Sequence, residues 1–142
     1  MTDPELLAKK LAEIETYVRE LQVLADPDRL GSDVKEERFI AHTLQLAIQT
    51  ALDVGSHIVS DERLGEPRTN REIFVLLDRA GWISPDLATR LRDMAGFRNV
   101  LVHAYSQVDH SIVREIVTER LSDLTAYVAV IRGRLPADQV GG

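Results

Sequence analysis

The sequence predicts an all-α fold of about five helices packed in one bundle. Two observations support this prediction. Leucine, isoleucine and valine recur at spacings of three and four residues along most of the chain, and no stretch alternates strictly enough to indicate a strand. The length of 142 residues suits one domain, so we expect a single domain over residues 1–142 with a frayed tail after about residue 135.

The first expected helix begins after Thr2 or Asp3 as its N-cap. Pro4 then occupies the first helical position, where a missing N–H costs nothing. Its apolar stripe comprises Leu7, Leu11, Ile14, Val18 and Leu21. A loop over residues 26–31, which contains proline and glycine, ends this element.

The second expected helix is long and central, running from a cap at Ser32 or Asp33 to about Ser60. Besides apolar positions it carries a line of polar residues at spacings of three and four, which places them on one face. The line comprises His42, Gln45, Gln49, Asp53, Ser56 and Ser60. It is either the solvated face of an amphipathic helix or the lining of a polar groove or subunit interface, and its low charge favours the groove slightly.

Three further helices complete the expected bundle. A short helix ends at Gly81 as its C′ residue, the next runs toward Tyr105, and the last carries a stripe from Val113 to Ile131. The expected N-caps are Thr69 or Asn70 for the short helix and Ser84, followed by Pro85, for the next. A break over residues 107–109 precedes the last helix.

Composition excludes several classes of protein. The absence of cysteine excludes disulfides, thiolate metal sites and a cysteine nucleophile, and it suits a reducing cytosol. The chain has no apolar run long enough to cross a bilayer and no signal-peptide pattern at its start, so we expect a cytoplasmic protein. With a net charge of −6, contact with nucleic acid must be local. We expect neither a metal nor another cofactor.

The segment from Gly96 to Tyr105 carries the densest chemical signal. Arg98, Asn99, His103 and Tyr105 alternate there with apolar residues. Histidine suits proton transfer at neutral pH, and the arginine fork matches phosphate oxygens. Together these groups can cleave RNA without metal: a base removes the ribose 2′-hydroxyl proton, the alkoxide attacks phosphorus, and a cation stabilises the charge on the phosphoryl oxygens.

The spacing of these groups points to a site shared between two copies of the chain. Five residues along a straight α-helix place Arg98 and His103 about 140° apart, whereas Asn99 and His103 share a face. One motif therefore does not surround a phosphate alone. Two motifs that meet across a homodimer would do so.

At these residues the sequence resembles the HEPN ribonucleases, and within them the HepT toxins of HepT–MntA toxin–antitoxin pairs. The family motif is Arg-x4-His-x-Tyr, here Arg98, His103 and Tyr105, with Asn99 after the arginine. Further similarity lies in the segments 51–53, 80–84 and 109–113 and in the loop at Pro67, so the resemblance covers about residues 6 to 135.

The resemblance implies a homodimeric, metal-independent endoribonuclease that arrests growth. Arg98, Asn99 and His103 would be catalytic, and Asp53 and Gln49 would line a supporting groove. It also implies a partner: an MntA-like nucleotidyltransferase antitoxin that transfers AMP from ATP onto Tyr105. The added bulk and negative charge would exclude RNA.

Two other hypotheses remain open. In the first, the chain is a non-catalytic binding or target subunit of the nucleotidyltransferase, which the acidic charge favours slightly. A plain helical interaction module would explain the periodicity but not the cluster of Arg98, Asn99 and His103.

Overall fold

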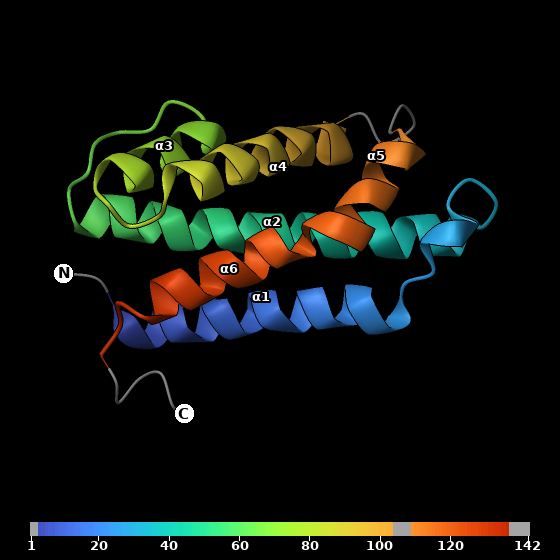
Figure 1. Ribbon diagram of the computed structural model, residues 1–142, viewed down its shortest axis with the longest axis horizontal. Helices are drawn as coiled ribbons and strands as arrows, with labels where there is room; N and C mark the ends of the chain where they lie inside the picture. Colours follow the sequence, from blue (N-terminus) through green and yellow to red (C-terminus); the bar gives the residue numbers. More distant parts are fainter. Residues whose placement is uncertain (1–2, 104–108, 137–142) are drawn as a thin grey trace.

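The computed structural model describes residues 3–103 and 109–136, and its helices pack around α2 (Figure 1). In chain order the elements are α1 (Pro4–Leu24), the 3-10 turn η1 (Pro27–Arg29), α2 (Val34–Asp61), α3 (Asn70–Arg79), α4 (Pro85–His103), α5 (His110–Glu115), the π-helix η3 (Ile116–Arg120) and α6 (Leu121–Arg132). The described ranges contain no strand. The all-α prediction is confirmed.

The helices begin where the sequence places their capping residues. The carboxylates of Asp3 and Asp33 and the hydroxyl of Thr69 each accept hydrogen bonds from the first backbone N–H groups of α1, α2 and α3. The hydroxyl of Ser84 does the same for α4, at 3.2 Å. Gly81 follows the end of α3 with a φ of 79°, the left-handed conformation that favours glycine. The expected caps and the Gly81 stop are confirmed.

The last expected helix differs from the prediction in one respect. It runs from α5 to α6 without leaving helical geometry, but five residues between them form the wider turns of η3. Val113 of α5, Val117 of η3 and Leu121 of α6 are all buried. The predicted apolar stripe therefore stays inside the bundle through the i→i+5 turns of η3.

Helix α2 packs closely against α3 and α6 because Gly55 has no side chain. A Cβ at this position would lie 2.6 Å from Cγ2 of Ile73 and 3.2 Å from the hydroxyl of Tyr127. Tyr127 is fully buried, its hydroxyl donates to the carbonyl of Ala51 at 2.9 Å, and its ring meets Phe74 edge-on. Burial raises the pKa of this hydroxyl, so Tyr127 serves packing.

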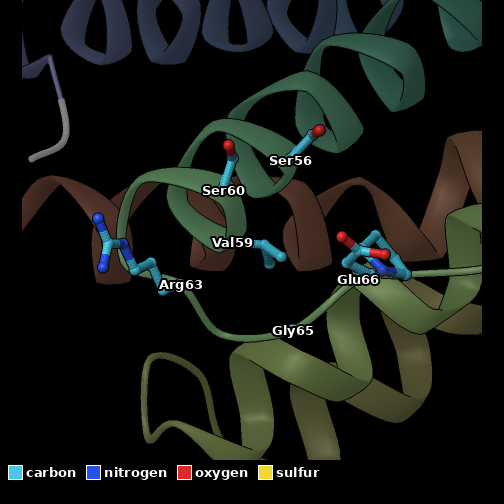
Figure 2. A pocket seen from close by; sticks show the side chains of 7 residues that line it. Ser56, Val59, Ser60, Arg63, Gly65 and Glu66 are labelled. Atoms are coloured by element: carbon cyan, nitrogen blue, oxygen red, sulfur yellow. The ribbon is translucent and has the colours of Figure 1, made fainter.

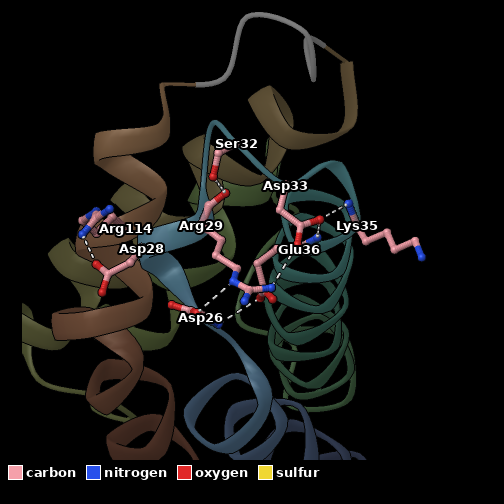
Figure 3. Close-up of polar contacts among 8 residues, drawn as sticks. All are labelled: Asp26, Asp28, Arg29, Ser32, Asp33, Lys35, Glu36 and Arg114. Atoms are coloured by element: carbon pink, nitrogen blue, oxygen red, sulfur yellow. Dashed lines mark hydrogen bonds and ion pairs between the residues drawn. The ribbon is translucent and has the colours of Figure 1, made fainter.

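The connection between α1 and α2 is held by a cluster of ion pairs (Figure 3). Arg29 pairs with Asp26 and Asp33. Arg114 of α5 donates to Asp28 at 2.6 Å and so ties α5 to this connection. Figure 1 shows that the C-terminal end of α4 lies at this end of the bundle, whereas α1 begins and α6 ends at the other.

Candidate functional site

The last turns of α4 carry the residues predicted to be catalytic. Arg98, Asn99 and the backbone of His103 lie within this helix, which continues regularly to its end at His103. The positions of Arg98 and His103 are therefore about 140° apart around the axis of α4, as the sequence predicts. Tyr105, the fourth motif residue, lies outside the described residues.

Arg98 is held part-buried, without a neutralising partner among the described residues. Its Nη1 donates to Oδ1 of Asn99 at 3.4 Å, a long and weak hydrogen bond. Its Nε is buried and has no hydrogen-bond partner in the described part of the chain. A buried N–H of a permanent cation that lacks an acceptor is unfavourable, so this guanidinium is available to an anion.

Two cavities flank the motif end of α4. One, of about 430 Å³, lies between α3 and α4 and is lined by Asn99 with Arg71 and Arg92. The other, of about 360 Å³, lies between α2 and α4 and is lined by Leu101 with Arg38, His42 and Gln45. Both cavities are lined by arginine, although the chain is acidic as a whole.

The polar line of α2 is divided among different neighbours. His42 and Gln45 face the cavity beside Leu101 on α4. Gln49 instead donates to Asp53 at 3.0 Å, and Asp53 pairs with Lys10 of α1 at 3.8 Å. The structure therefore groups the two predicted groove residues, Asp53 and Gln49, with each other and with α1 rather than with the motif.

Ser56 and Ser60, the last members of that line, border a cavity of about 570 Å³ at the opposite end of α2 (Figure 2). The loop after α2 forms the other wall, where Arg63, Gly65 and Glu66 line the cavity. Sequence reasoning did not predict this cavity, because its wall is a loop whose path no periodicity signals.

The chain re-enters the described region at a strong helix cap. Asp109 accepts hydrogen bonds from the hydroxyl and the backbone N–H of Ser111, at 2.6 and 2.8 Å, and these bonds lower the pKa of its carboxyl. His110 lies next in the chain, with Nε2 3.8 Å from the Glu37 carboxylate. The start of α5 therefore lies beside α2.

The described residues contain no group of three or more side chains arranged to hold a metal ion. None of the described helices is both long enough and apolar enough to cross a membrane. The chemistry visible at α4 is that of an amide and uncompensated guanidinium groups, a set that suits the phosphate groups of an anionic ligand.

The helical bundle, with Arg98 and the position of His103 on the last turns of α4, agrees with the HEPN-type protein that the sequence resembles. Residues 8–131 match the family described as ribonuclease HepT-like, and the chain belongs to this family.

Similar proteins include two named nucleases. The mRNA nuclease HepT of Shewanella oneidensis is 28% identical over 129 residues, which cover 90% of this chain and 97% of that protein. The tRNA nuclease HepT of Aphanizomenon flos-aquae is 29% identical over 135 residues, covering 94% and 92%. A solved structure of the tri-AMPylated Shewanella HEPN toxin with its MNT antitoxin has a TM-score of 0.84 at 28% identity, covering 94% of this chain and all of that one.

Proposed function

We propose that this protein is the toxin of a HepT–MntA type toxin–antitoxin pair and acts as a metal-independent endoribonuclease in the cytoplasm. The observation that carries the proposal is the conjunction of Arg98, Asn99 and His103 on the last turns of α4, in a chain of the ribonuclease HepT-like family. The unsatisfied guanidinium of Arg98 supports a role in binding phosphate. The relatives named mRNA nuclease and tRNA nuclease support RNA as the substrate.

The proposed reaction uses the side chains of α4 alone. His103 removes the proton of a ribose 2′-hydroxyl, the oxygen attacks the adjacent phosphorus, and the bond from phosphorus to the 5′-oxygen of the next nucleotide breaks. The products are a 2′,3′-cyclic phosphate and a 5′-hydroxyl, which takes up a proton. Arg98 stabilises the charge on the phosphoryl oxygens, and Asn99 supplies a further hydrogen bond.

A homodimer is part of this proposal. The regular helix from Arg98 to His103 directs the two positions about 140° apart, so the clamp and the base of one chain do not converge on one phosphorus. A second copy whose α4 faces the first would supply the missing group from the other side. The phosphate would then lie between two motifs.

The partner in this proposal is a nucleotidyltransferase antitoxin that transfers AMP from ATP onto Tyr105. The solved complex of a tri-AMPylated HEPN toxin with an MNT antitoxin supports this, since that toxin is 28% identical over most of the chain. A phosphodiester-linked AMP two residues from His103 would add bulk and negative charge where RNA must bind.

The test is cleavage of RNA in EDTA by the purified protein, freed of partner and shown by intact mass to carry no AMP. We expect the parent and His57→Ala, a matched histidine change on α2, to cleave, and His103→Ala to be inactive with unchanged helix content and oligomeric state. Cleavage by His103→Ala would refute the assignment of the base.

Absence of cleavage by the unmodified parent would refute the nuclease function. It would favour instead a non-catalytic target or binding subunit of the nucleotidyltransferase, a role that the net charge of −6 suits better.

A further inference from the structure

The cavity between α3 and α4 places two unpaired arginines beside the motif. It has a volume of about 430 Å³ and is lined by Arg71 and Glu72 from the start of α3 and by Arg92 and Asn99 from α4. Asn99 belongs to the proposed active site, so this cavity opens next to it.

Neither arginine is neutralised within the described part of the chain. No carboxylate there lies within ion-pair distance of Arg71 or Arg92, and the Nε of Arg92 is buried without a hydrogen-bond partner. Arg90, two residues earlier in α4, contrasts with them because Asp123 accepts from its Nε at 2.8 Å. Glu72 also lines the cavity, but its carboxylate accepts the backbone N–H of Arg68 at 3.3 Å. The cavity therefore presents two guanidinium groups and one carboxylate, none of which takes part in an ion pair within the described residues.

Gly96 brings the Arg71 side chain onto α4. A Cβ at Gly96 would lie 3.7 to 3.9 Å from Cδ, Nε and Cζ of Arg71, so this side chain crosses the helix surface at that turn. Arg92, Gly96, Asn99 and His103 follow at spacings of four, three and four and so share one face of α4. The arginines thus lie in line with the position of the proposed base.

The distance along α4 separates this cavity from the cleaved phosphate. At a rise of 1.5 Å per residue, Gly96 lies about 10 Å and Arg92 about 16 Å from His103 along the axis. A phosphate held by Arg71 and Arg92 therefore lies further along the strand than the one that His103 and Arg98 would act on. Guanidinium groups bind phosphate oxygens with two parallel hydrogen bonds, which suits them to a phosphodiester.

We infer that the cavity between α3 and α4 is a subsite for a phosphate of single-stranded RNA on the same strand as the cleaved bond, with Arg71 and Arg92 as its ligands. This inference rests on the proposed ribonuclease function and deepens it. The subsite positions the strand along α4 and takes no part in the chemical step.

Binding is measured with a single-stranded RNA oligonucleotide in a His103→Ala background, over a series of salt concentrations. We expect Arg71→Gln and Arg92→Gln each to raise Kd on the order of tenfold at low salt. Each should also reduce the slope of log K against log salt by about 0.7, the value for one phosphate contact on a single strand. Arg79→Gln, an equal loss of charge at the far end of α3, should change neither.

Cleavage is measured with the same arginine changes in the otherwise unaltered protein. We expect KM to rise on the order of tenfold and kcat to stay within about twofold, because the subsite acts on binding. If the parent cleaves RNA but Arg71→Gln and Arg92→Gln keep the KM and salt slope of Arg79→Gln, the subsite is refuted and the ribonuclease function stands. If the unmodified parent neither binds nor cleaves RNA, the proposed function fails and the subsite fails with it.

Discussion

Gly55 tests whether close packing of α2 on α3 and α6 limits the stability of this bundle. Gly55→Ala would place a Cβ 2.6 Å from Cγ2 of Ile73 and 3.2 Å from the hydroxyl oxygen of Tyr127. Carbon atoms prefer separations of about 3.5–4.0 Å, so Ile73 would have to withdraw by roughly 1 Å. Gly96→Ala is the matched change, because its Cβ would lie 3.7 Å from the nearest neighbouring atom, an ordinary contact.

Both substitutions gain the higher helix propensity of alanine, but they differ in how the new Cβ packs. Alanine is favoured over glycine inside a helix by about 1 kcal/mol, so Gly96→Ala should stabilise the protein by about that amount. At Gly55 the overpacking of a close-packed core should cost about 1–3 kcal/mol against the same gain. Gly55→Ala should therefore be about 1–3 kcal/mol less stable than Gly96→Ala.

Urea denaturation followed by circular dichroism measures this difference. All proteins should be compared at one concentration, because association of subunits would itself change the midpoint. We expect the urea midpoint of Gly96→Ala to exceed that of the parent, and the midpoint of Gly55→Ala to be lower than that of Gly96→Ala. The dependence of the unfolding free energy on urea concentration should be similar for all three proteins. Equal shifts for the two variants would show that α2 does not need glycine for its approach to Ile73 and Tyr127.

Two further predictions concern modification and pH. Incubation with the partner nucleotidyltransferase and ATP should raise the intact mass of the parent in AMP steps but leave Tyr105→Phe unchanged; a mass gain in that variant would move the acceptor elsewhere. Glu15 accepts two hydrogen bonds from Arg132, and this pairing lowers the pKa of its carboxyl below the ordinary 4.5. Because the folded-state pKa is depressed, the stabilisation is present above pH 4.5 and is lost as the pH falls further. Because the pair is partly exposed, Glu15→Gln should lower the free energy of unfolding by only about 0.5–1 kcal/mol at pH 7 and by almost nothing near pH 3. Urea midpoints of parent and variant that differ equally at both pH values would contradict this.

Most of the fold could be predicted from local patterns. Helix positions followed from apolar residues spaced by three and four, and helix ends followed from capping residues such as Asp33 and Ser84. The π-helix η3 could not be predicted, because buried residues spaced by four, as in Val113, Val117 and Leu121, also occur along the regular helix α2. The role of Gly55 could not be predicted, because a glycine in a helix does not reveal which neighbour approaches it.

The candidate site was predictable only where its residues lie on one helix. The sequence placed Arg98, Asn99 and His103 at the end of one helix, as the structure has them. It could not say which neighbour meets each turn of α2. Of the two predicted groove residues, Asp53 pairs with Lys10 of α1, and Gln49 donates to Asp53. The cavity of Arg71 and Arg92 was missed for the same reason, since it exists only where α3 approaches α4.

The opposite placement of the helix ends has a practical consequence. Helix α1 begins and α6 ends at one end of the bundle, and α4 carries the motif to the other (Figure 1). A protein immobilised on a sensor surface through either terminus would therefore present its arginine-lined cavities to the solution. A label attached at either terminus would likewise lie away from the surface on which we propose that RNA binds.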